Sequence, residues 1–493
     1  MVDKIRIVAC IGVVVYYNVF LVNLRDREQG GSMLEFNTGY NTFDADSYTV
    51  QLRDVEEPEL FRELFSYDEF PRIGFNHRLT PMRMPKQIWI TDTSFRDGQQ
   101  SMPPYKVKQV VDLFKLLHRL GGPKGIIRQA EFFVYTDKDK KIIEKVQALG
   151  YDFPEVTGWV RAKKKDLKIA RDLGLKEAGI LTSVSDYHIF LKLRKTRREA
   201  MDHYLNVVRS ALDSGITPRC HFEDVTRADF YGFVVPFAHE LMEISREAKK
   251  KIKIRVCDTL GLGVPYPGVA MPRSVPGLIY GLEYYAGVPS EWMEWHGHND
   301  LHMVNSNAVT AWLYGCSAAN TTILGIGERT GNPSLEGMVA SYLQLRGNDA
   351  QIDTTVITEI AEYFEKELNF NLPMNQPLVG RDFNMTRAGI HADGLLKNEE
   401  IYNPFNTETL LNRPISVAIT DKSGMAGIVL WVHNNLGRGD GKLSKRSAGV
   451  RIIHEWIMTE YAAGRTTSIS DREMLKQVKT HLASWMEASG FAV

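Results

Sequence analysis

The chain has 493 residues, more than a single hydrophobic core usually holds, so we expect one large domain with added segments, or two domains. Hydrophobic residues make up 44% and charged residues 24%, a balance that excludes a disordered or fibrous protein. The 60 basic residues equal the 60 acidic ones, so we expect no nucleic-acid partner. Four cysteines without a Cys-x-x-Cys pair argue against a disulfide framework and favour a cytoplasmic location.

Residues 1–85 form an N-terminal segment without a clear repeat. Within it, residues 5–22 are an apolar run of about the minimum length that crosses a membrane. One interpretation is a short signal-anchor, and the other is a stretch outside the functional protein, since Met33 opens a more ordinary polar start. We expect the second, and therefore no membrane association.

From residue 86 to residue 346, short apolar runs alternate with stretches of helical periodicity, which is the pattern of a parallel α/β fold. The helical spacing is clearest after the first run, at Val107, Val110, Val111, Phe114, Leu117 and Leu120. The predicted strands are Gln87–Thr91, Gly125–Glu131, Glu155–Val160, Glu177–Ser183, Arg219–Glu223, Ile252–Cys257, Glu291–His296 and Thr321–Gly325. Eight such units in roughly 250 residues predict a (β/α)8 TIM barrel.

Two further regions are predicted after the barrel. Residues 347–410 form a loop-rich linker subdomain that carries His391, and residues 411–493 form a mostly helical C-terminal region. In the latter, Val450, Ile453 and Ile457 follow helical spacing. No β-rich regulatory domain is predicted at the end.

Polar side chains follow several predicted strands at their carboxyl ends. They are Arg96-Asp97, Glu223-Asp224, Asp258-Thr259, His296-Gly297-His298 and Glu328-Arg329-Thr330-Gly331-Asn332. In a TIM barrel the catalytic groups lie at this end of the strands. We therefore expect all of them to converge on one barrel mouth, as in an enzyme.

A metal site is predicted at this mouth. His296 and His298 are alternate residues at a strand end, so both imidazoles can face one cation, although two hydrogen-bonded loop histidines would give the same pattern. Asp97 and Asn332 add a carboxylate and an amide oxygen. This mixed set suits a divalent ion, manganese first, with magnesium, cobalt, iron or zinc as alternatives.

Charged residues beside that site allow catalytic or structural interpretations. A fixed Arg96 guanidinium near a metal can stabilise negative charge on an enolate or alkoxide oxygen, or it can pair with a barrel carboxylate. Glu223, Asp224 and Arg227 form either a structural ion-pair cluster or part of the catalytic machinery.

Five motifs resemble those of the metal-dependent acyl-CoA condensing enzymes, the group of isopropylmalate, homocitrate and Re-type citrate synthases. They are Asp92 to Gly98, Cys257 to Gly261, His296 to Asp300, Gly325 to Asn332 and Ala388 to Gly394. They occur in the family's order. The resemblance implies an acyltransferase that condenses acetyl-CoA with a 2-oxo acid and releases CoA.

The resemblance also implies individual roles. Asp97, His296 and His298 would ligate the metal, with Asn332 as a further ligand or a close neighbour. Arg96 would face the 2-oxo acid and the nascent enolate.

Proton transfer and substrate contacts follow from the same resemblance. His391 would assist proton transfer, with Glu223 as the other candidate base, and Thr259 would contact the substrate. In this family the segment that carries the histidine often comes from the partner subunit, so we expect a homodimer.

The identity of the 2-oxo acid depends on its second carboxylate, which needs a cation in the pocket. Arg161 closes the third predicted strand, where homocitrate synthases place a substrate-side arginine, and Arg128 is a second candidate. The residues from Arg96 to Tyr105 and from Asp421 to Gly424 resemble the Re-type citrate synthases most. We therefore expect oxaloacetate, with homocitrate and isopropylmalate synthesis as alternatives.

Two other classes compete with this prediction. A biotin-dependent carboxyltransferase shares the barrel and the metal ligands, but it needs a metal-bridging lysine on a middle strand, and the strand Arg219–Glu223 has none. A non-catalytic membrane-anchored binding protein would need the run at residues 5–22 and a barrel that has lost its activity.

Overall fold

The computed structural model describes residues 34–37, 42–45, 50–437 and 443–490 of the chain, which forms two compact units, Met1–Thr49 and Val50–Val493. In the first unit, β1 (Leu34–Asn37) pairs antiparallel with β2 (Thr42–Ala45). The predicted apolar run at residues 5–22 lies outside the described residues. Among the residues that are described, no helix combines the length and the apolar character needed to cross a membrane.

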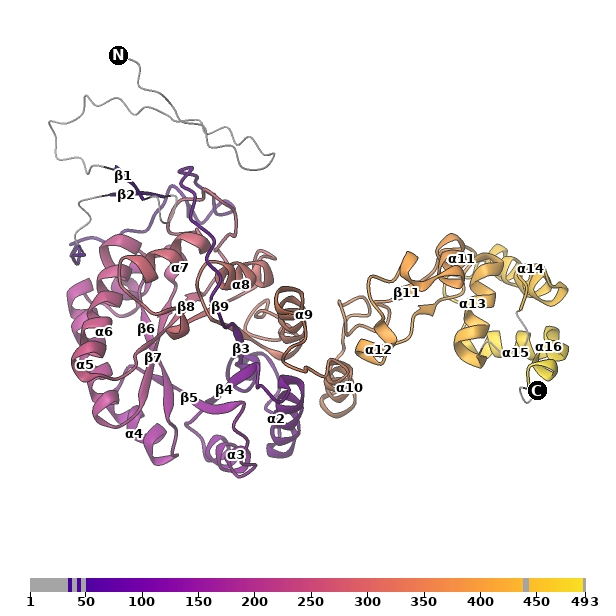
Figure 1. The fold of residues 1–493 in the computed structure, drawn as a ribbon, viewed down its shortest axis with the longest axis horizontal. Coiled ribbons are helices and arrows are strands. Elements are labelled where there is room, and N and C mark those ends of the chain that lie inside the picture. Colours follow the sequence, from indigo (N-terminus) through magenta and orange to yellow (C-terminus); the bar gives the residue numbers. More distant parts are fainter. Residues whose placement is uncertain (1–33, 38–41, 46–49, 438–442, 491–493) are drawn as a thin grey trace, which may run out of the picture. The chain divides into compact units, whose positions relative to one another are not determined.

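Eight parallel strands of the second unit close into a barrel, which confirms the predicted fold class (Figure 1). The strands are β3 (Trp89–Asp92), β4 (Ile127–Phe133), β5 (Glu155–Arg161), β6 (Glu177–Ser183), β7 (Thr217–Glu223), β8 (Lys253–Asp258), β9 (Met293–Gly297) and β10 (Ala318–Thr321). Strand β10 pairs with both β9 and β3 and so closes the ring.

Helices follow the strands and surround the barrel (Figure 1). They are α2 (Val107–Gly121), α3 (Asp137–Gln147), α4 (Lys164–Asp172), α5 (Arg197–Asp213), α6 (Val235–Ala248), α7 (Val275–Tyr284), α8 (Val304–Leu313) and α9 (Leu335–Arg346). Helix α2 is the one predicted from its spacing, and it buries Val110, Phe114 and Leu117. Short turns fill the loops: η1 (Ser94–Gly98), α1 (Gln99–Ser101), η2 (Tyr187–Lys192), η3 (Val225–Arg227), η4 (Phe230–Val234), η5 (Ser290–Trp292) and η6 (Ile323–Gly325).

The eighth predicted strand, Thr321–Gly325, was wrong in its position. The strand ends at Thr321, and the chain then turns through η6, where Leu324 has a φ of 57° and Gly325 a φ of 68°. A positive φ is incompatible with an extended strand. The apolar run that suggested a strand therefore belongs to the loop at the barrel mouth.

The inside of the barrel is charged. Along β7 alternate side chains face opposite ways: Phe222 packs outward on Phe237 of α6, with ring centroids 5.1 Å apart, whereas Arg219 and His221 are buried in the barrel interior. Most TIM barrels fill this space with bulky apolar side chains. Burying charged side chains here is unusual and indicates a role other than filling the barrel.

The stretch that precedes β3 is tied to the barrel by a buried arginine. Arg197 at the start of α5 is fully buried, and its guanidinium donates to Asp186 at 2.7 Å and to Asp229 at 2.9 Å. It also donates to the carbonyl oxygen of Arg53 at 2.8 Å. One guanidinium thus holds two loops and the upstream chain together.

After the barrel the chain is mostly helical, as predicted. The elements are α10 (Val356–Leu368), β11 (Met385–Thr386), α11 (Gly389–Lys397), η7 (Glu399–Ile401), α12 (Thr407–Leu411), β12 (Ser416–Val417), α13 (Gly424–Leu436), α14 (Ala448–Ala462), α15 (Asp471–His481) and α16 (Ala483–Ala488). From α11 onward they share a core in which Ile428, Val450, Ile453 and Met474 are fully buried. The domain boundaries predicted at residues 85, 346 and 410 stay predictions.

Replacing Arg197 should destabilise the barrel, because Arg197→Ala leaves two buried carboxylates without their cation. The expected loss in the free energy of unfolding is roughly 3–5 kcal/mol. Urea denaturation measures it, with Arg198→Ala, an exposed neighbour on the same helix, as the control. Equal midpoints for the two variants would contradict the anchoring role.

Candidate metal and active site

A tight turn after β3 brings Asp97 to the barrel mouth. The side chain of Asp92 accepts hydrogen bonds from the backbone and the hydroxyl of Ser94, both at 2.9 Å, and the amide of Asp97 donates to Thr93 at 2.8 Å. These bonds wind η1 into a turn that carries Arg96 and Asp97 into the buried mouth.

Three candidate ligands meet in the mouth. Oδ2 of Asp97 lies 3.4 Å from Nε2 of His296, at the end of β9, and 3.6 Å from Nε2 of His298. The three ligating atoms lie within 4.8 Å of one another, and all three side chains are buried. This is the spacing of a group that can hold one metal ion.

Unpartnered atoms test whether a cation fits. Oδ1 of Asp97, Oδ1 of Asn332 and Nδ1 of His298 are buried and have no hydrogen-bond partner. Leaving a buried polar atom unsatisfied costs about 1–3 kcal/mol. A cation held by Asp97, His296 and His298 would satisfy the free oxygen of Asp97, so these three residues fit a divalent ion. Asn332 lies beside them, with its Nδ2 donating to Oδ2 of Asp97 at 3.3 Å.

The protonation of the ligands also suits a cation. Burial lowers the pKa of His296 well below its ordinary value, and burial lowers the pKa of His298 too, so both imidazoles are neutral. Burial alone would raise the pKa of Asp97, but the charge of Arg96, the contacts with the two histidines and the hydrogen bond from Asn332 together outweigh it and lower the pKa to about 2. Neutral imidazole and ionised carboxylate are the forms that bind metals.

Neighbouring amides fix the orientation of the ligands. Nδ1 of His296 donates to Oδ1 of Asn320 at 2.8 Å, because that amide oxygen can only accept, and Nε2 is left with its lone pair toward Asp97. The Nδ2 of Asn332 donates to the carbonyl oxygen of Gly297 at 3.0 Å and to Oδ2 of Asp97 at 3.3 Å, and so holds the carboxylate in place.

Arg96 lies beside the metal set and is held by a carboxylate of the barrel interior. Its Nε donates to Oε2 of Glu131 at 2.9 Å, its Nη1 lies 3.5 Å from Oδ2 of Asp97, and the side chain is only 11% exposed. The predicted pairing with a barrel carboxylate and the predicted place beside the metal site therefore both hold.

Glu131 belongs to a buried ion network that fills the barrel. We call it the barrel ladder; it comprises Glu131, Glu177, Arg219, Lys253, Arg255 and Glu294. Arg219 donates to Glu131 at 2.7 Å and to Glu177 at 2.9 Å, and Lys253 donates to Glu177 at 2.5 Å. Arg255 joins Glu131 at 2.9 Å to Glu294 at 2.6 Å. The ladder runs from Arg96 at the mouth to Lys253 at the first residue of β8.

The carboxylate of Glu223, a candidate base, is held by three neighbouring side chains. Its carboxylate lies 3.1 Å from Nδ1 of His188 and 3.1 Å from Nζ of Lys192, and it accepts a short hydrogen bond from Ser183. Burial would raise the pKa of Glu223, but the contact with His188 and the other two lower it to about 2. A carboxylate with so low a pKa is a weak base.

Asp224 and Arg227 also form the ion pair that the sequence left open. The guanidinium of Arg227 donates to Asp224 at 2.9 Å and stacks on Tyr187 at 3.9 Å, and the amide of Asp224 donates to the hydroxyl of Thr259 at 2.8 Å. Thr259, which follows β8, is thus held at the mouth by the loop after β7, the preceding strand.

Of the two arginines predicted for the second carboxylate, one is at the wrong end of the barrel. Arg161 ends β5 at the mouth, where it pairs with Asp166 at 2.8 Å and remains 48% exposed. Arg128 is the second residue of β4 and lies over the ring of Trp89, the first residue of β3. Arg128 therefore belongs to the amino ends of the strands and cannot reach the metal set.

His391 lies in the post-barrel region and not among the metal set. It is exposed on α11, with its ring 4.4 Å from that of Tyr402, and it lines a cavity of about 760 Å³ together with Arg387 and Asn403. Within the described part of the chain it forms no hydrogen bond or ion pair with the barrel.

The prediction from sequence missed several of these residues. His188 and Lys192 follow β6 on η2, and Tyr402 follows His391 by eleven positions. Charged residues at alternate positions of a strand, Arg219 and His221 on β7, were the available signal for a charged barrel interior.

The fold and the site together define a class: TIM-barrel proteins with a candidate divalent-metal site and a fixed arginine at the carboxyl ends of the strands. The comparisons with known proteins agree with it. The HMGL-like family model matches residues 87–364, and the chain belongs to this family.

Three relatives match most of the chain. A citrate (Re)-synthase of Syntrophus aciditrophicus is 55% identical over 436 residues, which cover 88% of this chain and 69% of that protein. A citrate (Re)-synthase of Clostridium kluyveri is 54% identical over 429 residues, covering 87% and 95%. A 2-phosphinomethylmalate synthase of Streptomyces hygroscopicus is 35% identical over 441 residues, covering 88% and 99%.

Removing one imidazole should weaken metal binding. In His298→Ala we expect the affinity for Mn²⁺ to fall at least 100-fold, more than the roughly 10- to 100-fold loss typical of residues that only support a ligand. Equilibrium dialysis against Mn²⁺ measures it on folded protein. His302→Asn, at an exposed histidine four residues along the chain, should bind normally. Unchanged binding in His298→Ala would rule out this ligand set.

Proposed function

We propose that the chain is a Re-type citrate synthase, which condenses acetyl-CoA with oxaloacetate and water to give citrate and CoA. The observation that carries the proposal is Arg96 beside the candidate metal set at the barrel mouth, in a chain 55% identical to a citrate (Re)-synthase. Acetyl-CoA and oxaloacetate are thus its proposed partners, and the cytoplasm its proposed location.

Asp97, His296 and His298 would hold the divalent ion, with Asn332 as a fourth ligand or a close neighbour. When bound there, such an ion supplies Lewis-acid polarisation of the 2-oxo acid's ketone. Mn²⁺ is our first choice among the ions that accept this mixed nitrogen and oxygen set.

Arg96 would stabilise the charge that develops during the reaction. Its guanidinium is buried and is oriented by Glu131 before any substrate arrives. A preorganised donor of this kind typically contributes a factor of about 10² to 10³ in kcat.

His391 is the proposed base. It would take a proton from the methyl group of acetyl-CoA on an imidazole nitrogen, because Glu223 is held as a weakly basic, ion-paired carboxylate. His391 would come from the partner subunit of a homodimer, since within one chain it makes no hydrogen bond or ion pair with the described barrel residues.

The reaction balances without a covalent enzyme intermediate. The carbon deprotonated by His391 bonds to the ketone carbon of oxaloacetate, and the ketone oxygen takes up a proton to become the tertiary hydroxyl. Water then cleaves the thioester, so that CoA leaves as the thiol and citrate gains its third carboxylate. This hydrolysis makes the overall reaction irreversible.

Arg161 and Thr259 are the proposed substrate contacts. Arg161 keeps half of its side chain exposed at the mouth although it is paired with Asp166, and it can turn toward the second carboxylate of oxaloacetate. The hydroxyl of Thr259 lies at the end of β8, next to the loop that carries Asp224.

Homocitrate and isopropylmalate synthesis remain the alternatives within this chemistry. The carboxyltransferase alternative is disfavoured, because β7 offers Arg219 and His221 but no lysine. The binding-protein alternative is disfavoured by the full set of candidate ligands around Asp97.

Substrate preference tests the proposal directly. Purified protein with Mn²⁺ and acetyl-CoA is offered oxaloacetate, 2-oxoglutarate, 2-oxoisovalerate and pyruvate separately, and the release of CoA is followed. We expect kcat/KM to be at least 100-fold higher with oxaloacetate than with the others. A preference for 2-oxoglutarate would replace the proposal with homocitrate synthesis, and no release with any of them would sink the condensation chemistry.

The product of the same assay reports the face of attack. Citrate made from carbon-labelled acetyl-CoA is cleaved by a si-specific citrate-cleaving enzyme. Attack on the re face leaves the label in oxaloacetate, whereas attack on the si face returns it as the two-carbon product.

A further inference from the structure

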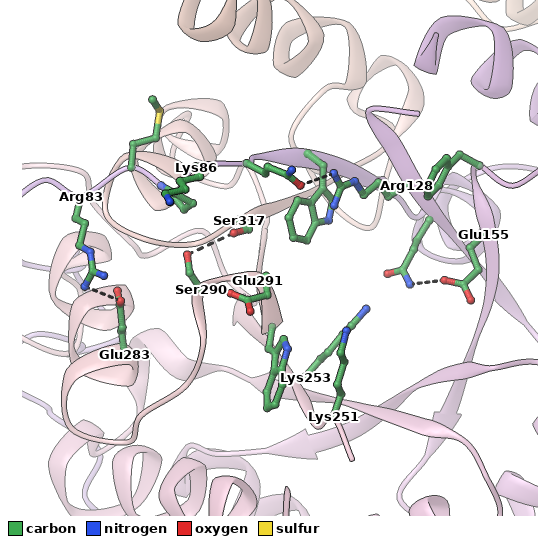
Figure 2. A pocket seen from close by; sticks show the side chains of 17 residues that line it. Arg83, Lys86, Arg128, Glu155, Lys251, Lys253, Glu283, Ser290, Glu291 and Ser317 are labelled. Carbon is green, nitrogen blue, oxygen red and sulfur yellow. Dashed lines mark hydrogen bonds and ion pairs between the residues drawn. The ribbon is translucent and has the colours of Figure 1, made fainter. Parts of the chain in front are cut away.

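A cavity of about 880 Å³ lies at the end of the barrel opposite the candidate metal site. We call it the floor pocket. It is lined by residues where strands begin, including Trp89 of β3, Arg128 of β4 and Lys253 of β8, and by Trp292 of η5 (Figure 2). Its volume is in the range of roughly 300–1,000 Å³ that small-molecule sites occupy.

The lining of the floor pocket is positively charged. It carries five basic and three acidic side chains, and within the described part of the chain Lys86, Arg128 and Lys251 have no carboxylate partner. Lys251 precedes Lys253, the first residue of β8, by two positions, and both side chains line the pocket (Figure 2). The pocket therefore offers several cations to a multivalent anion.

An aromatic ring and a carboxylate accompany the cations. Trp292 is half-buried and has no ring contact with another described aromatic or cationic side chain, whereas the ring of Trp89 is covered by Arg128 at 4.2 Å. The exposed carboxylate of Glu291 is adjacent to Trp292 and has no ion pair among the described residues. An indole face suits a flat base, and the carboxylate can accept hydrogen bonds from hydroxyl groups.

We propose that the floor pocket binds a nucleoside polyphosphate such as ADP. The phosphates would lie against Arg128, Lys251 and Lys253, the base would stack on Trp292, and Glu291 would accept hydrogen bonds from the ribose. No single anion without a ring uses all of these features. Binding of ADP here does not require that the condensation proposed for the other end of the barrel takes place.

The pocket is connected to the mouth by the barrel ladder. Lys253 lines the pocket and pairs with Glu177, whose other oxygen accepts from Arg219. Arg219 in turn holds Glu131, the partner of Arg96. A ligand on Lys253 would therefore act on a continuous row of charges that ends beside the metal set.

Binding of labelled ADP by equilibrium dialysis tests the proposal without any assay of activity. Full-length protein is dialysed with EDTA, which removes metal ions that would bridge the phosphates. We expect one ADP per chain. Lys251→Ala and Arg128→Ala should each weaken binding at least tenfold. Lys145→Ala, at an exposed lysine of α3 that has no ion pair with any described residue, should not.

A second comparison separates a nucleotide from a bare anion. Trp292→Leu should weaken ADP at least fivefold and leave the competition by inorganic pyrophosphate unchanged. Melting temperatures of all variants report whether they fold. Three results would each overturn the proposal. The first is that all three variants fold and bind ADP as tightly as the unchanged protein. The others are no binding of ADP at millimolar concentration, and equal affinity for ADP and pyrophosphate.

Discussion

The contact between Arg96 and Glu131 is the interaction on which the rest of the site depends. At 2.9 Å it turns the guanidinium toward the candidate metal set, and it is made inside a barrel where Glu131 and Arg255 are almost fully buried. Taking ions out of water is costly, and apolar replacements for buried ion pairs are often neutral or stabilising. A network that only stabilised the barrel would have little advantage over the usual apolar filling.

The barrel ladder holds the charged side chains inside the barrel in fixed orientations. Each carboxylate of the ladder is shared by at least two cations, so no member can rotate without leaving a buried charge unpaired. Arg96, at one end of the ladder, is held in a fixed orientation by its contact with Glu131. At the mouth the same logic holds the metal set, because Asn320 and Asn332 fix the imidazole and amide atoms that face Asp97.

Much of the fold and of the metal set could be predicted from sequence, because both depend on local patterns. Alternating apolar runs mark the strands, and His296 and His298 stand two positions apart at a strand end. The ladder could not be predicted in the same way, since Glu131 and Arg255 are 124 positions apart in the chain. Nothing local says that two charged strand residues face each other across a barrel.

The errors have physical causes as well. Arg128 was a candidate for substrate contact because the second strand was predicted at Gly125–Glu131, which places Arg128 in its middle. The strand is Ile127–Phe133, so Arg128 is its second residue and lies at the amino end. Glu223 was a candidate base because it ends a strand at the mouth. Its carboxylate is paired with His188 and Lys192 from the loop after β6, which the sequence did not indicate. The run at residues 321–325 was apolar enough for a strand but contains backbone with positive φ.

The central claim is that Glu131 orients Arg96 for catalysis, and a comparison of Glu131→Gln with Glu177→Gln tests it most directly. Both variants remove one buried carboxylate charge from the ladder, but only Glu131 contacts Arg96. With Mn²⁺, acetyl-CoA and oxaloacetate, kcat should fall at least tenfold in Glu131→Gln and less than threefold in Glu177→Gln, with similar melting temperatures and unchanged Mn²⁺ affinity. An equal fall in both variants, or none in either, would contradict the claim.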